Sequence, residues 1–230
     1  MSADLDEPEH DLYEERGNVP LYLPMMQGDV FRDIEVPLLG EGPQTVQIVM
    51  HPCAMRNGEN LNPIITVAPV TPRQDRIQSR FWRESSRFMP LPDLFENGVD
   101  FATRLPDMTG AKPEELQLDL RIAVLSQHGV QLLQQRMAYF MTRLKVDLPE
   151  IREQLSPIFC ELEMQADWVD LAMSTAGDGD QLSAATEAER AFQGWLSEQN
   201  GRRRKLLQDQ DQHASLRRQA HLESERRYRA

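Results

Sequence analysis

Residues 28–71 read GDVFRDIEVPLLGEGPQTVQIVMHPCAMRNGENLNPIITVAPVT, and this stretch decides the fold. Short runs of β-branched residues alternate in it with Gly, Pro and Asn, a pattern typical of closely spaced antiparallel strands. The pattern predicts strands over 30–36, 45–50 and 64–70, with a turn at the Asn-Gly pair 57–58. Short connections of this kind favour a small β-barrel.

Further strands are predicted on both sides of this stretch. Residues 19–26 carry two prolines and predict an interrupted edge strand. Residues 88–91 and 99–105 predict two more barrel strands. Apolar and polar residues alternate over 116–124, as expected for a half-buried strand.

The composition divides the chain into three parts. Residues 1–18 are rich in carboxylates and poor in apolar groups, which predicts a mobile acidic N-terminus. Residues 19–147 form the predicted barrel domain. Residues 148–230 consist largely of helix formers and predict a helical extension, with a joint at 177–180 and a basic tail. The tail is nearly free of apolar residues after Leu207, so it is either a solvated helix or a segment that orders on a partner.

The order of these parts resembles the MazF/PemK toxin family over roughly residues 28–146. The matching features are a Gly-Asp pair at 28–29, a Gly-rich turn at 40–42, a hydrophobic strand at 46–50, and a strand that ends at Thr71. The segment Arg121-Ile-Ala-Val-Leu-Ser126 also matches, since Ser126 can cap a closing helix that ends near Leu144. The resemblance implies an α+β fold, with a small antiparallel SH3-like (PemK-like) barrel and its closing helix. It also implies nucleic-acid binding in a toxin-type or phage-defence system, with RNA favoured over DNA, and a possible homodimer.

The resemblance also implies candidate residues for RNA cleavage. Thr71 stands at the family's catalytic Thr position, but Gln44-Thr45 replaces the Arg-Pro pair that precedes the central strand. An arginine stabilises the charge that develops on a phosphate during cleavage. Arg73 is our candidate substitute, with Arg56 and Arg76 as alternatives. A metal-independent endoribonuclease is therefore an alternative function, while ordinary turn chemistry is the alternative role for Thr71.

The net charge of the chain is acidic, but two segments carry an excess of basic residues. The formal net charge is −12, yet residues 201–230 hold nine Lys or Arg against four Asp or Glu, and residues 73–87 hold five Arg against two. The five arginines recur at helical spacing, beside Phe81 and Trp82. Arginines near aromatic rings can contact phosphates and stack on unpaired bases. We therefore predict nucleic-acid contacts from Arg76, Arg80, Trp82, Arg83 and Arg87. The alternatives are a strand over 81–88, which would split the stripe, and a solvated surface.

The second basic segment gives another set of candidates. The cluster Arg202, Arg203, Arg204 and Lys205 could neutralise phosphates or pair with an acidic protein. A protein partner for residues 148–230 would make the chain a structural or adaptor subunit, the second alternative function.

Several classes of function have no support in the sequence. Motifs for nucleotide phosphates, zinc hydrolysis or a hydrolase triad are missing, so we expect no cofactor and no metal. His51 and Cys53 could form a nucleophile or two metal ligands, but a turn His and a small buried Cys are the simpler interpretation. The two cysteines, Cys53 and Cys160, give no disulfide framework. No apolar run is long enough to span a membrane, and we expect a cytoplasmic protein.

Overall fold

The computed structural model of the protein describes residues 4–57, 60–176 and 180–229. The chain divides into two compact units. Unit 1 comprises residues 1–19, 26–55 and 62–153; unit 2 comprises residues 20–25, 56–61 and 154–230. Within the described ranges, no helix combines the length and apolar character needed to cross a membrane.

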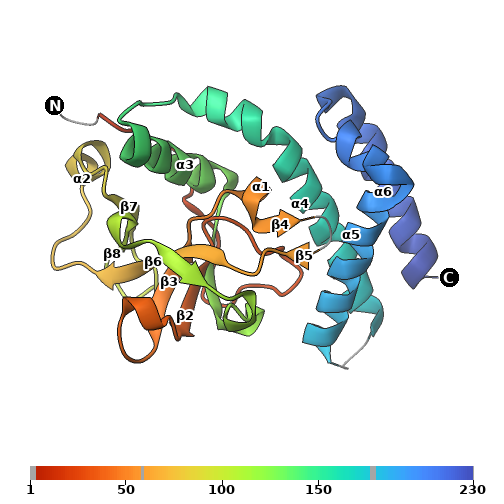
Figure 1. Ribbon diagram of the computed structural model, residues 1–230, viewed down its shortest axis with the longest axis horizontal. Helices are drawn as coiled ribbons and strands as arrows, with labels where there is room; N and C mark the ends of the chain where they lie inside the picture. Colours follow the sequence, from red (N-terminus) through yellow and green to blue (C-terminus); the bar gives the residue numbers. More distant parts are fainter. Residues whose placement is uncertain (1–3, 58–59, 177–179, 230) are drawn as a thin grey trace. The chain divides into compact units, whose positions relative to one another are not determined.

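Unit 1 combines an antiparallel sheet with helices (Figure 1). Its strands are β1 (Tyr13–Arg16), β2 (Val30–Ile34), β3 (Gln44–Ile48), β6 (Ile65–Pro72), β7 (Phe88–Leu91), β8 (Phe101–Arg104), β9 (Thr109–Ala111) and β10 (Arg121–Leu125). Its complete helices are α1 (Pro52–Met55), α2 (Ser79–Glu84) and α3 (Gln127–Thr142), with 3-10 turns at Pro37–Leu39, Leu105–Asp107, Pro113–Glu115 and Leu118–Leu120.

The sheet follows the strand order β1-β10-β2-β3-β6-β8-β7, and β9 also pairs with β6. Strand β6 is the pivot, because it pairs with β3 on one side and with both β9 and β8 on the other. This arrangement makes an antiparallel half-barrel, which confirms the predicted α+β class and most of the predicted strands. The SH3-like, PemK-like assignment stays a prediction.

The interior of the half-barrel is apolar. Strand β6 buries four consecutive residues, Val67 to Val70, as expected for a strand covered on both faces. Ile65 of β6 is buried too, and other strands and loops contribute further large buried side chains: Phe31, Ile34, Ile48, Met89, Leu91, Leu94 and Leu105. The β-branched runs that predicted the strands therefore also supply the core.

A buried ion pair joins the start of β10 to Asp29, the residue before β2. Arg121 Nη1 lies 2.9 Å from Asp29 Oδ2, and both side chains are almost fully excluded from solvent. Beside it, Gln47 donates a hydrogen bond to the Gly28 carbonyl (2.9 Å) and accepts one from Thr103 Oγ1 (2.6 Å). Removing one partner of a buried pair leaves an uncompensated charge and costs about 3–5 kcal/mol.

Residues 4–18 make specific contacts within unit 1, which corrects the predicted mobile N-terminus. Residues 13–16 form strand β1, which pairs with β10, and Leu5 and Leu12 are buried. Leu5 N donates to the Arg83 carbonyl, and Asp6 N donates to Gln135 Oε1. These partners lie far away in sequence, so the acidic composition gave no sign of them.

Helix α3 closes unit 1 and begins as predicted. Ser126 Oγ accepts from Gly129 N at 3.0 Å, which confirms the N-cap. Helix α3 packs on β7 and β10. A Cβ on Gly129 would lie 2.3 Å from the Leu12 carbonyl oxygen, so only glycine allows the N-terminal segment to pass this close.

One predicted strand is wrong, and another is shorter than predicted. Residues 19–26 form turns, because Pro20 and Pro24 lack backbone donors and Leu23 N bonds back to the Pro20 carbonyl. In the predicted strand at 116–124, residues 118–120 form a 3-10 turn, and Leu116 N and Leu120 N donate to carbonyls three residues earlier. Local bonds thus take the donors that a sheet would use, and only β10 remains extended.

Unit 2 is mainly helical, as predicted for the extension. Its helices are α4 (Leu148–Ala176), which starts in unit 1, α5 (Gln181–Leu206) and α6 (His213–Tyr228), with a 3-10 turn at Gln210–Gln212. A short hairpin of β4 (Arg56–Asn57) and β5 (Asn60–Leu61) also belongs to it. The predicted turn residue Gly58 and the joint residues 177–179 lie outside the described residues.

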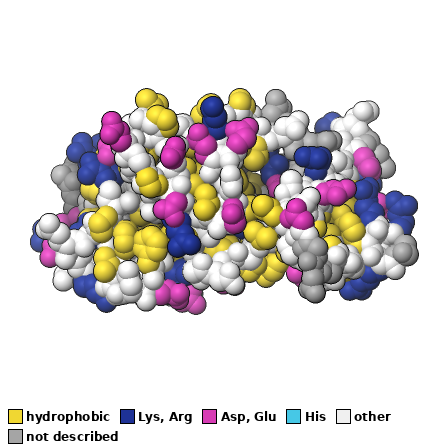
Figure 2. Space-filling model, turned by 90° about the horizontal axis from the view of Figure 1, so that it is seen from below, with side chains coloured by type: hydrophobic (Ala, Val, Ile, Leu, Met, Phe, Trp, Pro, Cys, Tyr) yellow, Lys and Arg dark blue, Asp and Glu magenta, His cyan; other side chains and the backbone are white. Residues whose placement is uncertain are grey.

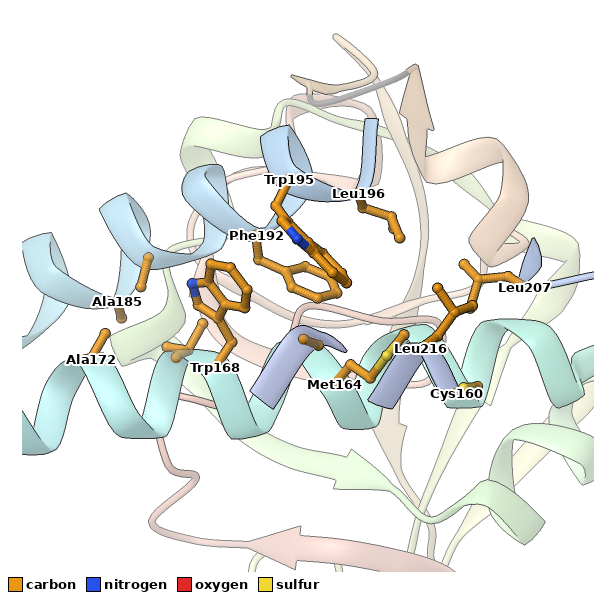
Figure 3. Close-up of a cluster of buried hydrophobic side chains, with 13 residues drawn as sticks. Cys160, Met164, Trp168, Ala172, Ala185, Phe192, Trp195, Leu196, Leu207 and Leu216 are labelled. Carbon is orange, nitrogen blue, oxygen red and sulfur yellow. The ribbon is translucent and has the colours of Figure 1, made fainter. Parts of the chain in front are cut away.

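An aromatic cluster forms the core of unit 2 (Figure 3). Trp168 of α4 meets Phe192 and Trp195 of α5, with ring centroids 5.6 Å apart in each pair. Helix α6 adds Leu216 and Ala220. Despite its polar composition, the C-terminal tail is therefore neither fully solvated nor dependent on a partner for a buried face.

Two irregular positions lie within the long helices. Pro157 lies inside α4, and the helix continues through it although proline lacks a backbone donor. Asn200 and Gly201 in α5 have positive φ angles of 57° and 70°, a conformation that Asn and Gly adopt most readily. Asp180 Oδ1 caps the start of α5 by accepting from Ser183 N.

Candidate nucleic-acid interface

Strand β6 leads directly into the arginine-rich segment of unit 1. Thr71 pairs with Ala102 of β8, and Arg73 N continues the ladder by donating to the Asp100 carbonyl at 2.8 Å. Alternate residues of an extended strand share a face, so Thr71 and Arg73 lie on the same side. The structure thus places the two predicted catalytic residues on the same face, at the end of β6. Both are half-buried.

Asp100 organises the loop that follows β6. Its carboxylate, only 4% exposed, accepts hydrogen bonds from Ile77 N (2.6 Å), Arg76 Nη1 (2.9 Å) and Asp93 N (3.0 Å). Burial by itself raises the pKa of Asp100, but these donors outweigh it and hold the pKa below its ordinary value. Asp100 therefore anchors the loop that carries Arg73 and Arg76.

Arg73 is held against an aromatic ring. Its guanidinium carbon lies 3.7 Å from the centroid of Phe81, a close cation–π contact. Its Nε is buried and makes no hydrogen bond within the described part of the chain. The charge of Arg73 is thus directed at Phe81, and Phe88 packs against the same ring with centroids 5.9 Å apart.

The five arginines do not form one helical stripe, which corrects that prediction. Helix α2 covers only residues 79–84, so Arg73 and Arg76 precede it and Arg87 follows it. The bond between Ile77 N and Asp100 holds the loop extended and delays the helix. The alternative of a strand over 81–88 is also wrong, since β7 begins at Phe88.

Four of these arginines still expose their side chains on one segment of unit 1, and we call them the arginine face: Arg76, Arg80, Arg83 and Arg87. Arg80 Nε lies 2.8 Å from Glu84, and Arg83 bonds to Ser79 Oγ and lies 3.6 Å from Glu7. These are surface contacts, which are individually weak. Figure 2 shows acidic and basic side chains interspersed over one side of the molecule.

Trp82 is buried, which corrects its predicted role in nucleic-acid contact. It is only 5% exposed and packs in the interior of unit 1. The fully buried Arg136 lies over its ring at 4.8 Å and donates to its carbonyl at 2.7 Å. Burial lowers the pKa of Arg136 to about 10, so this side chain stays charged at neutral pH. Trp82 therefore offers no face to a base.

An open pocket lies beside Phe81, with a volume of about 570 Å³. Arg76, Arg80, Asp75, Gln78, Glu84 and Ser85 complete its lining. Phe81, rather than Trp82, is thus the aromatic side chain at the arginine face. Pockets of several hundred Å³ suit ligands of nucleotide size.

The C-terminal cluster is divided between internal and external roles. Arg203 Nη1 donates to the Trp195 carbonyl (2.6 Å), and its guanidinium lies over the Trp195 ring. Arg204 lies 3.3 Å from Glu161 and also bonds to Gln193. Only Arg202 and Lys205 are exposed. Half of the predicted cluster therefore stabilises unit 2.

No local sequence signal marks several of the residues that order the candidate interface. Asp100 follows an ordinary Asn-Gly turn and lies more than 20 residues from Arg76, so no spacing signals their contact. In the sequence, Asp75 is one of the two acidic residues among the five arginines of 73–87, and no pattern sets it apart. The N-terminal Glu7 was assigned to a mobile segment.

The remaining candidates lie elsewhere. Arg56 pairs with Glu189 within unit 2. His51 Nδ1 accepts from Cys53 N at 3.2 Å, and Cys53 is exposed, which corrects the expected buried Cys. Among the described residues, no group of three or more His, Cys, Asp or Glu side chains is arranged to hold a metal ion.

Comparison with known proteins identifies no family for the chain. No protein-family model matches the chain, and no curated protein matches it.

Proposed function

We propose that the protein is a divergent PemK-like barrel protein that binds nucleic acid, RNA in preference to DNA, through the arginine face of unit 1. The toxin-type or phage-defence setting rests on the resemblance of residues 28–146 to the MazF/PemK family. The observation that carries the proposal is the pocket beside Phe81, which two exposed arginines line.

The charges of the arginine face suit a flexible polyanion. The side chains of Arg76 and Arg80 are 65% and 82% exposed, so their remaining donors are open to phosphate oxygens. Asp100 fixes the loop while leaving these donors outward. The aromatic ring in the pocket adds a stacking surface, which unpaired bases can use and paired bases cannot.

The experiment measures binding of fluorescein-labelled single-stranded RNA, duplex RNA and duplex DNA by anisotropy between about 50 and 200 mM salt. A triple variant, Arg80→Gln, Arg83→Gln and Arg87→Gln, keeps the Arg76–Asp100 pair. A control triple, Arg202→Gln, Lys205→Gln and Arg218→Gln, removes the same charge from exposed positions of unit 2. Circular dichroism verifies that both variants are folded.

We expect the wild type to bind single-stranded RNA most tightly, with affinity falling as salt rises. Each phosphate contact on a single strand contributes roughly 0.7 to the slope of log K against log salt, so the first triple should reduce the slope by about 2. The control triple should change it little. A denaturing gel of the same samples detects cleavage, which the endoribonuclease alternative requires.

Two results contradict the proposal. If no nucleic acid binds at low salt, the adaptor alternative gains weight. If only the control triple loses affinity, the interface lies on unit 2 instead.

A further inference from the structure

The pocket beside Phe81 holds hydrogen-bonding groups of both kinds in a small space. Two guanidinium groups, Arg76 and Arg80, supply donors, and the carboxylates of Asp75 and Glu84 supply acceptors. A site for phosphate alone would gain nothing from the carboxylates, since they repel it. The mixture therefore points to a ligand part that both donates and accepts.

These groups are not equally available. Glu84 forms an ion pair with Arg80 at 2.8 Å, and one nitrogen of Arg76 donates a hydrogen bond to Asp100. Asp75 is exposed, and its carboxylate makes no ion pair or hydrogen bond with the described residues. Each arginine has five N–H groups, so donors remain after its internal contact. The open groups are thus one carboxylate and two partly used guanidinium forks.

Guanine has the edge that fits these groups best. Its N1–H and N2–H are adjacent donors, which one carboxylate can accept together. Its O6 and N7 are adjacent acceptors, which an arginine fork binds in the commonest specific contact to a base. Uracil presents one N–H between two carbonyls, and cytosine and adenine each present one amino group beside acceptors. Only guanine offers a pair of donors and a pair of acceptors.

The ring of Phe81 provides the stacking surface in the same pocket. Arg73 at 3.7 Å and Phe88 at 5.9 Å hold the ring in place, so stacking a base on it requires little reorganisation. A base in a single strand can turn out of the stack at small cost, whereas a base in a duplex cannot.

We propose that this pocket takes one unpaired guanine of a single-stranded RNA, with Asp75 accepting from N1–H and N2–H and an arginine donating to O6 and N7. This inference rests on the proposed RNA binding at the arginine face and assigns its base preference. A free guanine nucleotide carries the same base, so the test must separate the two sources.

The test uses labelled heptanucleotides: U7 and three relatives in which G, A or C replaces the central U. Anisotropy at about 50 mM salt gives the affinities of the full-length protein, and unlabelled GMP serves as a competitor. The key variant is Asp75→Asn. Its matched control is Asp119→Asn, which removes one exposed carboxylate from unit 1 outside the pocket.

The G-containing heptamer should bind about tenfold more tightly than U7, as one bidentate base contact allows. Asp75→Asn should reduce this preference to twofold or less, while Asp119→Asn retains it. Neither variant should bind U7 more weakly than the wild type, because each removes a negative charge that repels phosphate. GMP should compete only at concentrations far above those of the heptamer, because it brings a single phosphate.

The outcomes separate the two proposals. Binding of all four heptamers with equal affinity overturns the guanine site and leaves RNA binding intact. No binding of any heptamer overturns the proposed function. If GMP competes as well as the G-containing heptamer, the ligand is a free nucleotide and the RNA assignment is overturned.

Discussion

Replacing Asp100 by Asn should loosen the arginine face and destabilise unit 1. The wild-type carboxylate accepts three hydrogen bonds, from Ile77 N, Arg76 Nη1 and Asp93 N, at 2.6–3.0 Å and nearly out of solvent. Asparagine keeps one carbonyl oxygen, so at least one N–H group would face an amide NH2. Each hydrogen bond to a charged group contributes about 1.5–3 kcal/mol, and one lost bond with two weakened ones gives about 2–4 kcal/mol.

The effect should depend on pH in a defined direction. The pKa of Asp100 is lowered in the folded protein, so its contribution is fully present above its ordinary pKa and is lost as pH falls through the lowered value. The difference in unfolding free energy between wild type and Asp100→Asn should therefore be largest near pH 7. It should shrink below about pH 4, the ordinary pKa of Asp.

Urea denaturation followed by circular dichroism, at several pH values, measures both quantities. Asp107→Asn is the control, because Asp107 makes an exposed ion pair with Arg104 and should change stability by less than about 1 kcal/mol. RNA affinity should also fall in Asp100→Asn, since Arg76 loses its anchor. An unfolding free energy within about 0.5 kcal/mol of wild type at pH 7 would refute this account of Asp100.

Three further substitutions test the packing. Leu5→Ala should cost about 2–5 kcal/mol in urea denaturation, because Leu5 is 1% exposed; a negligible change would restore the mobile N-terminus. Gly129→Ala should destabilise the protein and speed hydrogen exchange in β1, because the new Cβ would lie 2.3 Å from the Leu12 carbonyl oxygen. A Gly→Ala change in a helix usually stabilises by about 0.5–1 kcal/mol, and that result would contradict this contact. Phe192→Ala should cost about 3–5 kcal/mol in unit 2, measured as loss of tryptophan fluorescence on denaturation, and an unchanged midpoint would rule out the aromatic core.

The parts of the fold that sequence predicts well depend on local pattern. The β-branched run of β6 and the Ser126 cap of α3 each contain their own signal within a few residues. The helical extension was also recognisable, because its composition favours helix throughout. Its buried aromatic core follows from the apolar positions of α4 and α5.

The errors arise where distant residues decide the local structure. The N-terminal segment is ordered by bonds to residues such as Gln135, more than 100 positions away. The helical spacing of the arginines was real in sequence but was overridden by Asp100, which binds Ile77 N and limits α2 to six residues. The burial of Trp82 depends likewise on Arg136. Composition and periodicity contain no information about such pairs.

Photocrosslinking tests the central claim most directly, because it locates bound RNA on the chain. A single-stranded RNA that contains 4-thiouridine is bound at low salt, irradiated and digested, and the crosslinked peptides are identified by mass spectrometry. RNA at the arginine face predicts crosslinks within residues 73–88, reduced in the Arg80, Arg83 and Arg87 triple variant. Crosslinks confined to residues 201–230, or none above an unirradiated control, would contradict the assignment of RNA binding to unit 1.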